Sequence, residues 1–297
     1  MKSAGQTAPN STAILLLFIN GSLIALMLTL ATLATGQGVS PIAYAFWQTL
    51  GGGLLLGLLA VRQQAGTLNR AALRYFMISG ATVVAIPNAT AFFVVGKIGA
   101  GFTATLYAFP PIFTLLMSLA IKLETMSTQR LLGICFACAG CFLMIWAQQD
   151  SVSSDAFWWY VVGLVIPFSL AFGNVYRSIA WPKSFAALPL ASGMLFSAAA
   201  LLGTLSLLGD HSLTAGVMRA NNLGLMLAQV VITALTYLGF FELQKRSTPV
   251  FLSQMGAVAA LVGLAIGLFY FGTQYSLGVW LGVLVVISGL IITIKSQ

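Results

Sequence analysis

The sequence predicts an all-α integral membrane protein with ten transmembrane helices, built as two inverted five-helix repeats around a central cavity. Composition excludes a water-soluble domain, because 59% of the 297 residues are hydrophobic and 6% are charged, where a soluble domain carries about 25% charged residues. Apolar runs long enough to cross a bilayer give the helix count, since a spanning helix needs about 20 such residues. A weak internal self-match indicates the repeat.

Short polar stretches separate the apolar runs, which predicts one compact bundle. The first run is longer than the apolar core of a secretory signal, which is about 7–15 residues, so we expect it to be the first helix. The ten predicted spans are 12–33, 40–61, 74–95, 100–121, 128–147, 157–178, 185–208, 222–242, 249–271 and 275–294.

Lysine and arginine predict the orientation, because cytoplasmic loops carry an excess of both. Two of them, Lys97 and Arg219, fall in loops on the side opposite the termini. The loops on the side of the termini carry Lys2, Arg62, Arg70, Arg74, Lys122, Arg130, Arg177, Lys183, Lys245, Arg246 and Lys295. Both termini are therefore expected to be cytoplasmic. These cations are scattered rather than clustered on one face, which argues against a nucleic-acid partner.

The self-match appears when the chain is shifted by about half its length. Ser22 then falls on Ser169 and Lys97 on Lys245, at nearly the same offset. Because each unit has an odd number of helices, the second copy enters the membrane from the opposite face, as in many secondary transporters. The predicted parts are a cytoplasmic tail (1–11), the first repeat (12–147), an outer linker (148–156), the second repeat (157–294) and a cytoplasmic tail (295–297).

Residues 100–145 resemble the end of the five-helix unit of the drug/metabolite transporter superfamily, in its EamA-type ten-helix branch. The matching features are a proline in mid-helix, a glutamate just past that helix, a serine and two glycines seven residues apart. They are Pro110 or Pro111, Glu124, Ser127, Gly133 and Gly140.

The second copy keeps Gly282 and Gly289 but has Gly272 near the place of Glu124 and no proline near Val258. Within the superfamily the chain looks most like the YddG-type aromatic amino-acid exporters. The resemblance implies a multi-pass exporter of the bacterial inner (plasma) membrane. It also implies a lipid bilayer around the protein and a small-molecule substrate in a cavity between the halves.

Polar side chains near mid-span usually face the bundle interior. Singly, each could join helices by hydrogen bonds worth about 0.6 kcal/mol; together they are better explained as the lining of a cavity. With the deeper aromatic residues, the predicted substrate-binding set is Asn20, Tyr44, Gln48, Asn88, Tyr107, Phe109, Ser169, Asn174, Thr233 and Tyr237.

Prolines within the spans are the second indication of a site, because each removes a backbone donor and kinks its helix. Pro110 and Pro111 lie in the fourth span beside Tyr107 and Phe109. We expect these two prolines to supply a hinge, and the face that carries Tyr107 to contact substrate.

An enzyme is not expected, because no histidine or aspartate lies in the middle of a span. No cofactor or metal is predicted, and a channel would need a polar or charged pore ring. We expect a secondary transporter that exports small neutral metabolites, including aromatic amino acids, by alternating access as a uniporter. The alternative is a proton-coupled multidrug or lipophilic-cation exporter, which would need a buried acid. The oligomeric state is left open, with a monomer allowed.

Overall fold

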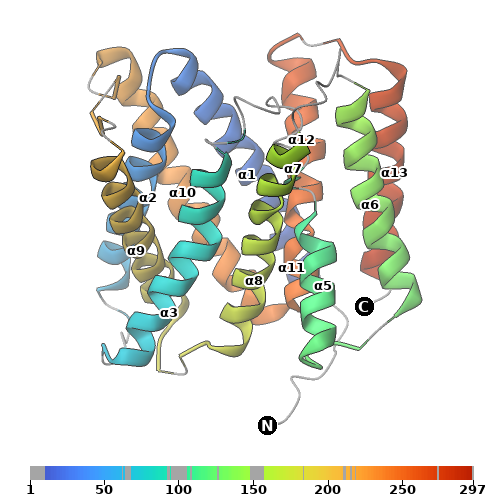
Figure 1. The fold of residues 1–297 in the computed structure, drawn as a ribbon, viewed down its shortest axis with the longest axis horizontal. Coiled ribbons are helices and arrows are strands. Elements are labelled where there is room, and N and C mark those ends of the chain that lie inside the picture. The colour runs from blue at the N-terminus through green and yellow to red at the C-terminus, as the bar shows by residue number, and fades with distance from the viewer. Residues whose placement is uncertain are drawn as a thin grey trace.

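The computed structural model is a bundle of α-helices that follow the ten predicted spans, which confirms the all-α membrane fold (Figure 1). It describes residues 11–61, 63, 68–91, 94, 106–107, 109–125, 127–147, 157–182, 184–209, 212–214, 216–217, 219–272 and 274–295. Within these ranges, seven helices are long and apolar enough to cross a membrane, and two apolar helices are shorter. Residues 1–10 of the predicted tail and the whole predicted linker 148–156 lie outside the described residues.

The first half contains one helix with a change of type. After α3, residues 81–85 form a π-helical turn, η1, and residues 86–91 are again α-helical. The helices of this half are α1 (Ser11–Gly36), α2 (Pro41–Ala60), α3 (Arg70–Gly80), α5 (Pro110–Ala120) and α6 (Thr128–Trp146).

The second half contains two interrupted spans. Leu164 separates α7 from α8, and Gln254 separates α11 from α12. The helices are α7 (Phe157–Gly163), α8 (Val165–Ile179), α9 (Ala187–Leu208), α10 (Ala220–Arg246), α11 (Pro249–Ser253), α12 (Met255–Phe269) and α13 (Leu277–Lys295).

The last helices of the two halves, α6 and α13, stand side by side at one edge of the bundle (Figure 1). They run antiparallel, and the glycines that the two copies share face one another. A Cβ built on Gly140 would lie 2.7 Å from the Gly282 carbonyl oxygen, and one built on Gly282 would lie 2.8 Å from the Gly140 oxygen. Glycine is needed here because the two backbones approach too closely for any side chain.

Other helix contacts also occur in matched pairs. α1 of the first half packs on α12, and its counterpart α8 packs on α5 in the same way. α1 also packs on α10, and α8 packs on the corresponding elements α3 and η1. α2 packs on α9, its counterpart in the second half, with the Ser192 hydroxyl donating to the Gly53 carbonyl at 2.8 Å. This is the contact pattern that an inverted repeat would produce.

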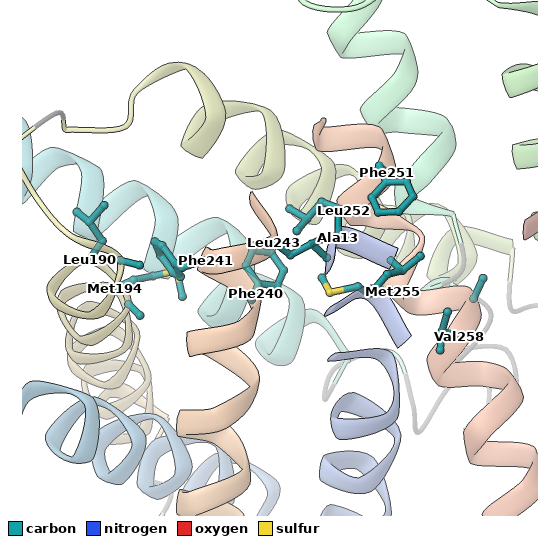
Figure 2. Packing of buried hydrophobic residues seen from close by; sticks show 14 of the residues in the cluster. Ala13, Leu190, Met194, Phe240, Phe241, Leu243, Phe251, Leu252, Met255 and Val258 are labelled. Carbon is teal, nitrogen blue, oxygen red and sulfur yellow. The ribbon is translucent and has the colours of Figure 1, made fainter. Parts of the chain in front are cut away.

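The largest apolar cluster joins α1, α9, α10, α11 and α12. Figure 2 shows Met194 of α9 beside Phe241 of α10, and Ala13 of α1 beside Leu252 and Met255. Because α1 begins where α10 ends and α11 begins, these elements share one end of the bundle, which we call the terminal end. Apart from Arg177 in the last turn of α8, the described cations at this end are Arg70, Arg74, Lys122, Arg130, Lys245, Arg246 and Lys295.

A buried ion pair closes the terminal end between the halves. Arg130, at the start of α6, lies 2.6 Å from a Glu124 carboxylate oxygen, and both side chains are nearly inaccessible. The other Glu124 oxygen accepts a hydrogen bond from the Val250 amide at the start of α11, at 3.3 Å. Glu124 therefore ties the first half to the first turn of a helix in the second.

Candidate functional site

The π-helical turn in the third span is explained by its proline and by a hydroxyl from α8. The Ile86 amide donates to the Ala81 carbonyl, five residues back, and the next such bond would need an N–H that Pro87 lacks. The Thr82 carbonyl freed in this way accepts from the Ser169 hydroxyl at 2.8 Å. Ser169 therefore joins two helices, and its hydroxyl is already engaged.

The fourth span is interrupted next to this turn. The Tyr107 hydroxyl donates to the Pro87 carbonyl at 3.4 Å, and the half-buried Asn88 side chain donates to the Val84 carbonyl at 2.8 Å. Phe109 packs with Leu115 and Val250. These contacts bring Tyr107 and Asn88 to one place.

The expectation that Pro110 and Pro111 lie in mid-helix is wrong. Both are buried and occupy the first two positions of α5, where a helix has no donor to lose and proline is favoured. The non-helical residues 107 and 109 therefore precede the prolines.

A second polar contact joins α2 to α10. The Gln229 side chain donates to the Gln48 side chain at 2.6 Å and to the Thr233 hydroxyl at 3.4 Å. Gly52 lets α10 approach, since a Cβ built there would lie 2.8 Å from a Thr233 methyl. Gln229 was not in the predicted substrate-binding set, but it connects two members of that set, Gln48 and Thr233.

Two other predicted residues are buried with an unsatisfied atom. Asn20 is fully buried against Gly239 and donates to the Leu16 carbonyl, but its side-chain oxygen has no partner among the described residues. Tyr44 belongs to a separate cluster with Val217 and Met226 near the opposite end. The structure therefore does not bring Tyr44 together with Tyr107.

Arg177 is the main correction to the sequence-based interpretation. It was counted among the loop cations, but it lies in the last turn of α8 and is 0% exposed. Its Nη2 donates to the Asn174 side-chain oxygen at 2.8 Å, and its Nε donates to the Gly173 carbonyl at 3.2 Å. Asn174 belongs to the predicted substrate-binding set and accepts a hydrogen bond from Arg177, which does not belong to that set.

Aromatic rings surround this guanidinium. Its central carbon lies 4.1 Å from the centre of the Phe240 ring and 5.6 Å from that of Phe241. The centre of the Tyr237 ring lies 6.3 Å from that of Phe240, and the Trp181 ring lies between those of Tyr75 and Phe241, with its centre 6.5 and 5.6 Å from theirs. This group, which we call the Arg177 cluster, draws on α3, α8, α9 and α10. The sequence signal was present, because Arg177 falls inside the predicted span 157–178, one turn after Asn174.

Acids are held away from this cluster. Glu242, near the end of α10, contacts Lys245 at 3.0 Å and Arg246 at 3.4 Å. Glu124 is paired with Arg130 at the terminal end. Neither acid lies within the bundle beside Arg177.

Gln254, at the junction of α11 and α12, is 1% exposed, and both its side-chain polar atoms lack partners among the described residues.

Comparison with known proteins agrees with this architecture. Residues 11–146 match the EamA-like transporter family. One solved structure, described only as "Crystal structure of protein", is similar with a TM-score of 0.79 at 15% identity, over 95% of this chain and 98% of that chain. No curated protein matches. At this identity the structural similarity shows the fold alone.

The family match covers α1 to α6, and the fold similarity extends through the second half. Residues 11–146 are thus similar to the EamA-like transporter family, and the whole chain has the fold of a multi-pass membrane protein.

Proposed function

We propose that this protein is a transporter that exports small neutral metabolites, amino acids including aromatic ones among them, as a uniporter working by alternating access. The exporting direction is what the resemblance to the drug/metabolite exporters implies, and the cations at the terminal end favour an inner membrane with both termini cytoplasmic. The single observation that carries the proposal is the placement of charge. Both described acids are ion-paired near the terminal end, while the other buried polar side chains are neutral amides and hydroxyls, with Arg177 as the buried cation among them.

A proton-coupled carrier needs a carboxylate that both sides of the membrane reach in turn. Glu124 is engaged by Arg130 and by the Val250 amide. Glu242 is engaged by two cations on its own helix, and these favour its ionised form. This argues for a uniporter rather than a proton-coupled exporter.

A lipophilic cation is a poor match for the interior. Arg177 is buried within the bundle with no acid beside it in the described part of the chain, so a second cation would meet like charge. The rings of Phe240 and Tyr237 offer apolar contact for an aromatic side chain. This feature favours the YddG-type aromatic amino-acid exporter over the multidrug alternative.

Alternating access is supported by the matched helix contacts of the two halves, 12–147 and 157–294. Exchange of conformations between similar halves would move the opening from one end of the bundle to the other. We expect the interruption before Pro110 and Pro111 to bend during this exchange. Tyr107, Asn88 and Tyr237 would then line the substrate path.

The test uses purified protein in liposomes loaded with labelled phenylalanine. Efflux to equilibrium with no pH gradient or voltage imposed is the expected result, and Glu242→Gln should leave it unchanged. An imposed pH gradient that drives accumulation above equilibrium, and whose effect Glu242→Gln abolishes, would replace the uniporter with the proton-coupled alternative.

A further inference from the structure

The Arg177 charge is incompletely satisfied. Its Nη1 has the Met194 sulfur as its partner at 3.8 Å, and a thioether is a weak acceptor. The other two contacts are to a neutral carbonyl and a neutral amide. No carboxylate lies against the guanidinium in the described residues. A buried cation without an anion is strongly unfavourable, so its presence inside a membrane bundle indicates a functional role.

The aromatic contacts stabilise this cation without using its donors. A ring attracts a cation through its negative face and accepts no N–H in doing so. Phe240, at 4.1 Å, therefore lowers the cost of burial but leaves Nη1 available for an oxygen. An arginine fork is suited to a carboxylate, which it binds through two parallel hydrogen bonds.

A second buried donor, in the same apolar cluster as Met194, Phe240 and Phe241, also lacks a partner. The Tyr75 side chain is 0% exposed, and its hydroxyl has no hydrogen-bond partner within the described chain. It comes from α3 in the first half, whereas Arg177 belongs to the second half. Two buried donors from opposite halves thus lack a good acceptor.

We propose that Arg177 and Tyr75 form a binding subsite for the carboxylate of the transported molecule, with Phe240 beside its apolar side chain. The proposal rests on the proposed function, which it deepens: the substrates would be carboxylate-bearing molecules with an apolar or aromatic side chain. Asn174 acts as a positioning residue, because its side-chain oxygen fixes one edge of the guanidinium.

The subsite is closed toward the terminal end by Trp181. The centre of its ring lies 5.6 Å from that of Phe241 and 6.5 Å from that of Tyr75, and the Lys245 ammonium lies 5.9 Å from it. Because Arg177 is fully buried, a carboxylate reaches it when Trp181 separates from these neighbours. Opening at the terminal end would therefore expose the subsite to the side from which an exporter loads.

The experiment measures binding to the full-length protein in detergent by calorimetry. Two probes separate the charges: 3-phenylpropionate has a carboxylate and no amine, and phenethylamine has an amine and no carboxylate. We expect the wild type to bind 3-phenylpropionate more tightly than phenethylamine. Arg177→Gln should weaken 3-phenylpropionate binding at least about tenfold, since a hydrogen bond to a charged group is lost, and should not weaken phenethylamine binding.

Three variants serve as controls. Arg219→Gln removes an exposed cation at the opposite end and should leave both affinities unchanged. Arg177→Lys keeps the charge and should retain part of the affinity. Tyr75→Phe removes one hydroxyl and keeps the ring, so it should weaken 3-phenylpropionate binding several-fold. It also provides the test if Arg177→Gln fails to fold.

The inference is overturned if the wild type does not bind 3-phenylpropionate, or if Arg177→Gln binds it as the wild type does. Unchanged binding in both Tyr75→Phe and Arg177→Lys also overturns it. Arg177-dependent binding without phenylalanine efflux would reject the proposed function and keep the subsite. Efflux that does not depend on Arg177 would keep the function and reject the subsite.

Discussion

Two buried arginines in this protein have opposite surroundings. Arg130 is 6% exposed and lies 2.6 Å from the carboxylate of Glu124. Arg177 is 0% exposed and is surrounded by aromatic rings, with a thioether and neutral groups as hydrogen-bond partners. The first charge is compensated by the protein itself, whereas the second is left for something else to compensate. Burial alone therefore does not distinguish a structural arginine from a ligand-binding one; the partner does.

The largest expected effect comes from making the same change at both positions. Arg130→Met leaves the Glu124 carboxylate buried without its cation, which should lower the free energy of unfolding by about 3–5 kcal/mol. Arg177→Met removes an uncompensated charge while losing a cation–π contact worth about 2 kcal/mol, so we expect stability within about 1 kcal/mol of the wild type. Denaturant unfolding in detergent micelles measures both.

Equal losses in the two variants would contradict the comparison, because they would mean that aromatic rings stabilise Arg177 as fully as Glu124 stabilises Arg130. The transport assay supplies an independent readout. Arg177→Met should lose phenylalanine efflux although it remains folded.

The second prediction concerns pH. Burial raises the pKa of Glu124, and the Val250 amide and the Arg130 charge oppose that rise. In Arg130→Met the opposing charge is gone, so the pKa of Glu124 rises further, and each unit corresponds to about 1.4 kcal/mol. Because the folded state then holds the proton more tightly than the unfolded state, stability is greatest at low pH and falls as pH rises through the raised pKa.

Unfolding of Arg130→Met at several values between pH 5 and pH 8 checks this sign. Its deficit against the wild type should be larger at pH 8 than at pH 5. A deficit that does not change with pH would show that the stability loss does not come from the Glu124 charge.

How far the sequence predicted these features depends on the range of the interactions. The ten spans could be predicted because hydropathy is local. The glycines shared by the two copies, Gly133 and Gly140 with Gly282 and Gly289, were also visible, and the structure shows that they face one another. The place of Glu242 beside two cations follows from helical spacing of three and four residues.

The Arg177 cluster could not be predicted in the same way, because its rings come from helices far apart in the sequence. A count of lysine and arginine assigns each cation near a span end to a loop, and burial of Arg177 appears only once α3, α9 and α10 are packed around α8. The prolines were misinterpreted for a related reason. A proline in an apolar run looks the same whether it kinks a helix or begins one, as Pro110 does.

The third prediction tests the unsatisfied state of the cluster without ligand. Tyr75→Phe removes a buried hydroxyl that has no partner among the described residues, and such a group costs about 1–3 kcal/mol. We expect the empty variant to be more stable than the wild type by about 1 kcal/mol, measured by unfolding in micelles. A loss of stability would show that the hydroxyl already has a good partner in the unliganded protein.

The smallest expected effect provides the exposed reference for both arginines. Glu242 lies 3.0 Å from Lys245 and 3.4 Å from Arg246, and its side chain is 31% exposed. Water solvates all three groups when the pair is broken, so Glu242→Gln should change the free energy of unfolding by less than about 1 kcal/mol. Salt should reduce even this difference, since exposed charges are screened. If Glu242→Gln instead destabilises the protein as much as Arg130→Met does, a paired acid would matter equally at the surface and in the interior. Burial would then no longer explain why Arg130 requires Glu124, and the missing acid beside Arg177 would lose its significance.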